Sequence, residues 1–321
     1  MMSQSVLLTG ASGFVGRAVL RRLVMDGVTV TAAVRHGANA PEEAAHTVWF
    51  DAFDTTDWRE HCVGIDAVVH CAARVHVMND VEADPLAAFR KVNVQGTLSL
   101  AEQAAQAGVR RFVFISSIKV NGEGTLPGKP YTADDTPEPS DPYGISKMEA
   151  EQGLLALAER TGMEVVIIRP VLVYGPGVKA NFLNMMRWLD NGVPLPFGAI
   201  NNRRSLVALD NLVDLIVTSI NHPAAANQIF LISDGEDLST TQLLRRTAAA
   251  LGKPARLLPI PAWMLSTAAR LLGKKALSQR LCGSLQVDIQ KAATLLHWSP
   301  PVSVDNALAS VAAQYMSDKK Q

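Results

Sequence analysis

The chain has 321 residues, of which 48% are hydrophobic and 19% charged, and Lys+Arg equals Asp+Glu at 30 each. This length suits one large α/β domain, alone or with a smaller one, and the apolar share excludes disorder for most of the chain. A net charge of zero offers no basic surface to nucleic acid. We find no signal peptide and no apolar stretch near the ~18 residues that span a bilayer, and therefore expect a cytoplasmic protein without a membrane span.

Short apolar runs alternate with amphipathic segments through residues 1–175. The pattern predicts strands and helices in turn, with strands at 6–8, 28–34, 48–50, 67–69, 112–115 and 165–168 and helices at 17–26, 85–107 and 143–161. The strands are almost wholly apolar, which is typical of a parallel sheet buried on both faces. We therefore expect an α/β fold with a Rossmann-type doubly wound parallel sheet.

The alternation ends where glycine and proline cluster, at 175–177 and 194–198. We expect a dinucleotide-binding domain at residues 1–175 and a smaller, mostly helical substrate-binding region at residues 176–321.

For three later segments the sequence supports a specific expectation. The apolar runs 206–208 and 229–232 are expected to return to the main sheet, so that residues 205–232 join the first domain. The amphipathic segment 262–272 has one basic residue, and we expect a helix that packs on the core. A membrane-surface or lid role is the alternative for this segment.

The cysteines and one histidine are expected to be structural. Cys62, Cys71 and Cys282 are too few and too scattered for a disulfide framework or a zinc site, so we expect reduced thiols and no metal. His70 ends an apolar strand, and we expect a packed core histidine rather than a ligand.

A glycine-rich turn, TGASGFVG at 9–16, follows the first strand and opens the first helix. Its three glycines permit a tight turn, close approach to a pyrophosphate and close helix–strand packing, and the helix N-terminus adds free N–H groups. We expect a dinucleotide to bind here, at Gly10, Ser12, Gly13, Phe14, Val15 and Gly16.

The end of the second strand bears on the choice between NAD and NADP. A carboxylate there would bind the ribose 2′-hydroxyl of NAD, but the sequence has Arg35, which could pair with a 2′-phosphate. We therefore favour NADP(H) and keep NAD open. Asp51, after the third strand, is expected to accept a hydrogen bond from the adenine amino group.

Tyr143 and Lys147 lie four residues apart at the start of an expected helix, which places both side chains on one face. The lysine ammonium is expected to lower the tyrosine pKa from ~10 toward working pH. The phenol could then exchange a proton with a sugar or alcohol oxygen while hydride moves to or from a nicotinamide. Ser117, after strand 112–115, is expected to hold the reacting oxygen, and Ser116 to satisfy backbone groups or contact the cofactor.

Five motifs follow one another along nearly the whole chain: TGASGFVG, HCAA at 70–73, FISSIKVNG at 114–122, YGISK at 143–147 and RPVLVYGPG at 169–177. Together they make the chain resemble the extended short-chain dehydrogenase/reductase family. Within it the chain is most similar to the nucleotide-sugar epimerase/dehydratase branch, especially UDP-glucose 4-epimerase-like proteins.

The resemblance implies roles for the matching positions. Ser117, Tyr143 and Lys147 would be catalytic, and Lys147 would also bind the nicotinamide ribose. Asn93 would support this lysine. The further cofactor contacts that it implies are Ala72, Ala73, Pro170 and Val173.

For the substrate, the resemblance implies that Arg204 binds the diphosphate of UDP, with Asn181 as a further candidate. It also implies a homodimer formed through the helices at 85–107 and 143–161, and a surface-polysaccharide pathway. The chain departs from the family pattern at Asn121, which replaces a tyrosine near the sugar site, and in having no acidic residue after the second strand.

The implied function is oxidoreduction at C4 of a nucleotide-activated sugar, of the kind catalysed by UDP-hexose or UDP-N-acetylhexosamine 4-epimerases. An NADPH-dependent 4-keto reductase of a UDP-4-keto-6-deoxy sugar would share the same machinery, and Arg35 favours that alternative. A small-ketone reductase and a non-catalytic dinucleotide sensor also stay open, although a sensor would not need Tyr143 and Lys147.

Overall fold

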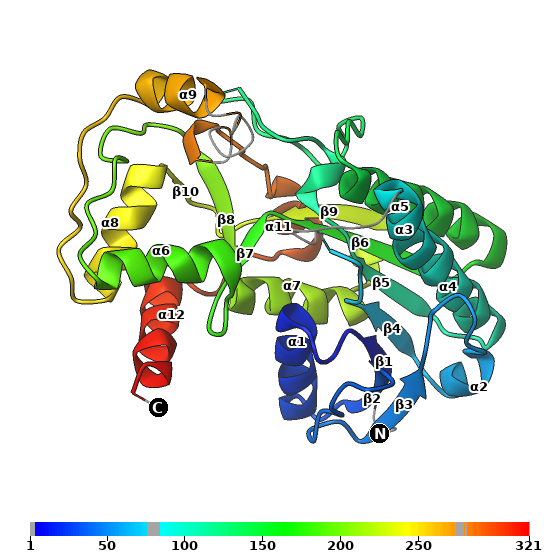
Figure 1. Ribbon diagram of the computed structural model, residues 1–321. Coiled ribbons are helices and arrows are strands. Elements are labelled where there is room, and N and C mark those ends of the chain that lie inside the picture. The colour runs from blue at the N-terminus through cyan, green and yellow to red at the C-terminus, as the bar shows by residue number, and fades with distance from the viewer. Residues whose placement is uncertain are drawn as a thin grey trace.

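The computed structural model describes residues 4–75, 84–126, 128–271, 273, 279 and 281–320. Seven parallel strands form the main sheet in the order β3-β2-β1-β4-β5-β6-β9, with helices on both faces (Figure 1). Its strands are β1 (Ser5–Thr9), β2 (Thr29–Arg35), β3 (His46–Phe50), β4 (Ala67–His70), β5 (Arg111–Ile115), β6 (Glu164–Pro170) and β9 (Gln228–Ile232). The predicted doubly wound parallel sheet is confirmed.

Two apolar cores explain why these strands have almost no polar residues. Successive side chains of β1 point to opposite faces, so Val6 and Leu8 pack in one core and Leu7 in the other. Helices α1 (Phe14–Met25) and α7 (Leu209–Asn221) cover the first core. Helices α4 (Thr97–Gln106) and α5 (Pro142–Thr161), with the short α2 (Arg59–Cys62), cover the second.

The helix expected at 85–107 is interrupted by a wider turn. It consists of α3 (Pro85–Arg90), a π-helical turn η1 (Lys91–Gly96) and α4. Gly96 ends this turn against Phe53, whose Cβ would lie 2.7 Å from a Cβ added to the glycine. Such π-turns often occur at functional sites, and this one contains the buried Asn93.

A second, three-stranded sheet consists of β7 (Leu172–Tyr174), β8 (Arg204–Ala208) and β10 (Asp237–Leu238). The prediction that 229–232 joins the main sheet is confirmed, because β9 pairs with β6. The same prediction for 206–208 is wrong, because β8 pairs with β7 and β10. An apolar run shows that a strand is buried, but it does not specify the strand beside it.

The C-terminal part is mostly helical, as predicted. Helices α6 (Ala180–Asp190), α8 (Thr240–Ala250) and α12 (Val304–Asp318) form a third core with the small sheet, while α11 (Gln290–Leu296) and the short turn η3 (Pro223–Ala225) pack near β9. Within the described parts of the chain, no helix has both the length and the apolar character needed to cross a membrane.

Helix α9 (Ala262–Leu271) departs from its expected place. It has no buried residue, so the predicted packing on the core is wrong. Its amphipathic pattern predicted a helix correctly but did not show what covers the apolar face. Leu272, the last residue of the predicted segment, lies outside the described residues.

Candidate active site

The glycine turn lies at the carboxyl end of β1, beside β4, where the order of the strands reverses. Gly10 has a φ of +72°, and a Cβ added to it would lie 2.7 Å from the backbone nitrogen of Ala72. A Cβ added to Gly16 would lie 2.1 Å from the carbonyl oxygen of Gly10. Gly13 caps α1 without a side-chain hydrogen bond, and Ser12 beside it is exposed. The first-turn N–H groups of α1, from Phe14 and Val15 onward, therefore suit an incoming phosphate, and these residues fit a dinucleotide.

Asn93 fixes the loop that follows β4. Its Oδ1 accepts from the backbone N–H of Arg74 (2.8 Å), and its Nδ2 donates to the carbonyl of the same residue (3.0 Å). The Nδ2 also donates to the hydroxyl of Ser146 (3.0 Å). These bonds connect the loop of Ala72 and Ala73 to α5. Asn93 thus bonds to the neighbour of Lys147 rather than to the lysine itself.

Local sequence starts α5 immediately before Tyr143. Asp141 caps the helix by accepting from the N–H of Gly144 (2.6 Å), and Pro142 occupies the first turn. The ring of Tyr143 contacts Phe89 of α3 edge-on at 5.9 Å. The Ser117 side chain lies close enough to the Tyr143 phenol to lower its pKa. The structure therefore brings the predicted serine and tyrosine together.

Lys147 is buried on the same helix, with 1% of its surface exposed. Its Nζ donates to the carbonyl of Ile115 at the end of β5 (2.8 Å) and lies 4.3 Å from the centre of the Phe114 ring. Burial lowers the pKa of Lys147 to about 7, and the negative charge of Glu151 opposes that change.

The prediction that the pKa of Tyr143 is lowered is wrong, because the chain's own groups raise it. Burial is the main reason that the pKa of Tyr143 is raised to about 12; the Ser117 side chain acts against this change, and the charge of Asp141 acts with it. The Lys147 ammonium bonds to the Ile115 carbonyl, so i,i+4 spacing alone did not show where its charge acts. A further positive charge is needed to bring this phenol into a useful range.

A buried polar network lies beneath the predicted site, and sequence reasoning missed it. The Ser116 hydroxyl donates to Glu151, so this side chain points into the network rather than toward a cofactor. Arg169 donates to Glu151 (Nη2 to Oε2, 2.6 Å) and to the Oδ1 of Asn121 (3.0 Å). The spacing of Lys147 and Glu151, four residues apart on one helix, was the available signal.

The predicted adenosine-side residues lie at the carboxyl ends of neighbouring strands. Arg35 ends β2 and is exposed, and Asp51 directly follows β3 and is also exposed. Arg35 stands opposite Phe50 in the strand register, which brings its backbone next to that of Asp51.

The predicted substrate residues Arg204 and Asn181, and the predicted cofactor contacts Pro170 and Val173, come from β6 and the elements that follow it. Arg204 begins β8, and its Nη1 donates to the carbonyl of Gly283 (3.2 Å). Asn181 is exposed in the first turn of α6. Pro170 ends β6, and Val173 lies half-buried in β7.

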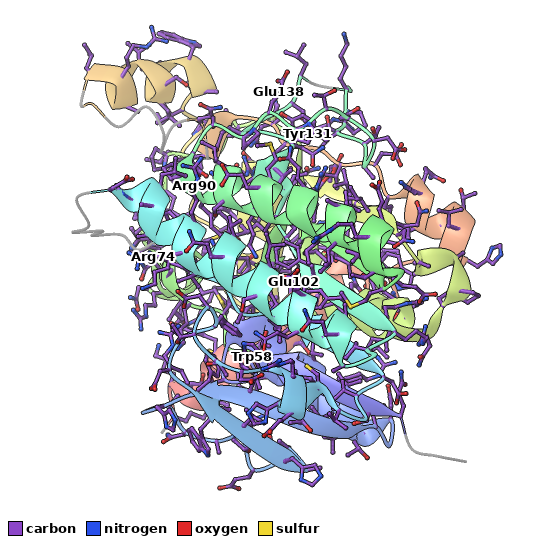
Figure 2. All side chains as sticks on the ribbon, turned by 90° about the vertical axis from the view of Figure 1, so that its right-hand side faces the viewer. Trp58, Arg74, Arg90, Glu102, Tyr131 and Glu138 are labelled. Carbon is purple, nitrogen blue, oxygen red and sulfur yellow. The ribbon has the colours of Figure 1, made fainter. Side chains whose placement is uncertain are left out.

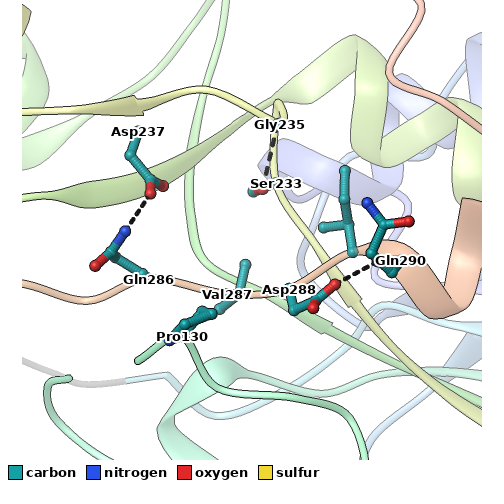
Figure 3. A pocket seen from close by; sticks show the side chains of 9 residues that line it. Pro130, Ser233, Gly235, Asp237, Gln286, Val287, Asp288 and Gln290 are labelled. Atoms are coloured by element: carbon teal, nitrogen blue, oxygen red, sulfur yellow. Dashed lines mark hydrogen bonds between the residues drawn. The ribbon is translucent and has the colours of Figure 1, made fainter. Parts of the chain in front are cut away.

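A hollow of about 250 Å³ lies beyond the carboxyl end of β9 (Figure 3). Pro130, Ser233 and Asp288 contribute to its lining, and Gln286 donates to Asp237 across it (2.6 Å). None of the sequence-predicted site residues lines this hollow, so we do not assign the chemistry to it.

The expected structural histidine is confirmed. His70 is 1% exposed and lies between the hydroxyls of Thr9 (2.8 Å) and Thr97 (3.1 Å). Burial lowers the pKa of His70 to about 3. The three cysteines are free thiols, and burial raises the pKa of both Cys62 and Cys71 to about 12.

A glycine turn that suits a phosphate, together with a tyrosine phenol near a serine and a buried lysine one helical turn further on, is the arrangement of a dinucleotide-dependent oxidoreductase of the short-chain class. The family model described as the NAD dependent epimerase/dehydratase family matches residues 6–233. The chain belongs to this family.

Individual relatives agree with that assignment. The chain is 50% identical over 317 residues to UDP-glucose 4-epimerase of Vibrio cholerae, which covers 98% of this chain and 96% of that protein. It is 29% identical over 307 residues (90% and 89% covered) to N-acetyl-alpha-D-glucosaminyl-diphospho-ditrans,octacis-undecaprenol 4-epimerase of Escherichia coli O157:H7. UDP-glucuronic acid 4-epimerase from Bacillus cereus, solved in complex with NAD, shares the fold with a TM-score of 0.78 at 21% identity, covering 98% and 99% of the two chains.

Proposed function

We propose that the protein is a UDP-hexose 4-epimerase that acts with a bound NAD(P). The observation that carries this proposal is the proximity of Ser117 to the Tyr143 phenol at the start of α5, one helical turn before the buried Lys147. The 50% identity to UDP-glucose 4-epimerase of Vibrio cholerae supports the choice of substrate class.

The chain's own residues would handle the proton at O4 of the sugar. Ser117 would hold O4 by its hydroxyl, and Tyr143 would take the O4 proton as C4 loses hydride. Tyr143 would give the proton back once hydride has returned to the opposite face of C4. The bound nicotinamide would supply a reversible hydride acceptor and a positive charge. That charge is the one the phenol needs, because its pKa is otherwise about 12.

The dinucleotide would be held by residues of the glycine turn and of the carboxyl ends of the strands. The glycine turn and the first turn of α1 would bind the pyrophosphate, and Lys147 would bind the nicotinamide ribose. Ala72, Ala73, Pro170 and Val173 would contact the cofactor, and Arg204 with Asn181 would bind the substrate. We propose residues 1–175 with β9 as the cofactor domain and the rest of 176–321 as the substrate domain.

The test is incubation of the purified protein with UDP-glucose and, separately, UDP-galactose. We expect each to convert to its C4 epimer with no net change in NAD(P)H absorbance. Consumption of one NADPH per turnover, with a UDP-4-keto-6-deoxy sugar alone as substrate, would replace the epimerase with the reductase.

Arg35 supports a finer proposal, that the site admits NADP(H). The exposed guanidinium at the end of β2 could bind a 2′-phosphate, and no carboxylate occupies that strand end. Arg35→Ala should weaken NADP binding about tenfold and leave NAD binding nearly unchanged, measured by fluorescence titration. Equal effects on both would show that Arg35 does not discriminate.

A second candidate substrate is a sugar joined through a diphosphate to a lipid. The uncovered apolar face of α9 favours it, and the Escherichia coli relative is named for such a substrate. Arg204 could bind either diphosphate. Conversion of undecaprenyl-diphospho-N-acetylglucosamine, with no conversion of any UDP-sugar, would select this candidate.

Assembly and location complete the proposal. The helices α3, α4 and α5 lie side by side on one face (Figure 2). This face would form a homodimer in which each chain contributes two long helices, the continuous α3–α4 helix and α5. Light scattering should give twice the mass of one chain. The free thiols suit the reducing cytoplasm.

A further inference from the structure

Helix α9 carries an apolar face that the rest of the described chain leaves uncovered. The exposed fractions are 69% for Trp263, 44% for Met264 and 83% for Leu271. At about 100° per residue, these three side chains fall within about 100° of arc around the helix axis. Figures 1 and 2 both show α9 at one end of the molecule, projecting beyond its neighbours.

The sequence around α9 is strongly basic. Residues 238–287 contain eight Lys or Arg and no Asp or Glu, although the whole chain has 30 of each kind. Arg245, Arg256 and Arg270 are exposed. Arg246 and Lys253 pair with acidic side chains from outside the segment. The apolar face therefore lies in a part of the chain whose charge complements an anionic surface.

We propose that α9 docks the protein on an anionic lipid bilayer, with Trp263, Met264 and Leu271 in the boundary between headgroups and acyl chains. Helices that lie in this boundary bury apolar side chains while nearby Lys and Arg attract anionic headgroups. An amphipathic tryptophan ring suits this depth. Two copies meeting through this face would bring the same basic segment against itself, so an anionic bilayer fits this segment better than a second copy of the chain.

Docking would place the start of β8 on the bilayer side of the molecule. Ala199 forms a β-bridge with Pro261 just before α9. After the helix, the carbonyl of Gly283 accepts from Asn202 (2.8 Å) and from Arg204 (3.2 Å). The helix is thus connected on both sides to the segment that leads into β8. The docking itself does not rest on the proposed function.

The experiment is co-sedimentation of the full-length protein with vesicles of phosphatidylglycerol and, in parallel, of phosphatidylcholine. We expect binding to phosphatidylglycerol vesicles that weakens at high salt, and much weaker binding to phosphatidylcholine. No binding to phosphatidylglycerol would overturn the proposal. So would a Trp263-dependent dimer in light scattering without vesicle binding, because the face would then belong to a second copy.

A double variant and a matched control locate the contact. Trp263→Ser with Leu271→Ser should weaken vesicle binding about tenfold or more and leave turnover of UDP-glucose unchanged. Trp188→Ser, at a tryptophan of α6 that is 48% exposed, should bind vesicles like the original chain. Equal binding by the double variant would refute the assignment to α9.

A second measurement avoids any dependence on the folding of the double variant. Brominated phosphatidylglycerol quenches tryptophan that enters the acyl boundary. We expect quenching in the original chain and clearly less in Trp263→Phe. Equal quenching in the two chains would also refute the proposal.

Discussion

Tyr143 can act as a base only if its proton is removable, yet the protein's own groups hold the pKa of its phenol at about 12. Tyr143→Phe keeps the ring against Phe89 and removes the hydroxyl. We expect turnover of the UDP-sugar to fall about 10²–10⁴-fold, with dinucleotide affinity nearly unchanged. Tyr315→Phe, on the distant helix α12, is the matched control and should keep full turnover. A Tyr143→Phe enzyme with normal turnover would show that another group handles the proton.

Lys147 predicts a pH dependence of stability. Its pKa is about 7 when folded and near 10.5 when unfolded, so between these values the unfolded chain binds the extra proton and stability rises with pH. Below about pH 7 both states hold the proton, and the folded state bears the full cost of a buried ammonium.

Lys147→Met removes that dependence. Its stability gain over the original chain should shrink as pH rises from 7 to 9, by at most roughly 1.4 kcal/mol per pH unit. His70, Cys62 and Cys71 are present in both chains, so the titration of these groups in the unfolded state cancels in the difference. Urea unfolding at pH 7, 8 and 9 measures the difference. A difference independent of pH would mean that the lysine is charged throughout.

At the scale of elements, two of the three carboxylates of α5 lie in different surroundings. Glu151 and Arg169 are 3% and 2% exposed, whereas Glu149 pairs with Arg90 at the surface. Glu151→Ala leaves a buried guanidinium without its carboxylate and should cost about 3–5 kcal/mol in the free energy of unfolding. Glu149→Ala, on the same helix, should cost less than about 1 kcal/mol. Similar costs for both variants in urea unfolding would contradict the buried pairing.

Elements with a continuous physical signal could be predicted from the sequence. Strands buried on both faces must be apolar throughout, and the glycines of the first turn have no room for a Cβ, so the sheet and its turn followed from residue type. The start of α5 followed from Asp141 and Pro142. The proximity of Ser117 and Tyr143 could be predicted because Ser117 follows the end of a strand and Tyr143 lies at the start of a helix.

The remaining features depend on neighbours that a single sequence does not reveal. β8 pairs with β7, a short strand that follows β6 almost directly. The hydrophobic pattern of the sequence does not show which strand β8 will pair with. The π-turn at 91–96 depends on the packing of Gly96 against Phe53. Whether the pKa of Tyr143 is raised or lowered depends on where the Lys147 ammonium bonds. The spacing of the two residues in the sequence does not specify that position.

For the whole molecule, the proposed division into cofactor and substrate domains raises the question of whether the two parts unfold separately. Strand β8 faces two cores: Val207 packs with the residues of β1, α1 and α7, while Leu206 and Ala208 pack with α6, α8 and α12. Because one strand contributes to both cores, separating them would expose apolar surface on both of its faces.

We therefore expect one cooperative transition. Hydrogen exchange in increasing urea should show peptides from β4 and from α8 losing protection at the same denaturant concentration. Dinucleotide should raise both midpoints together, because a ligand of the folded state stabilises every part that unfolds with its site. If peptides of α8 lost protection at lower urea, and dinucleotide shifted only β4, the C-terminal part would be an independent unit and β8 would not couple the cores.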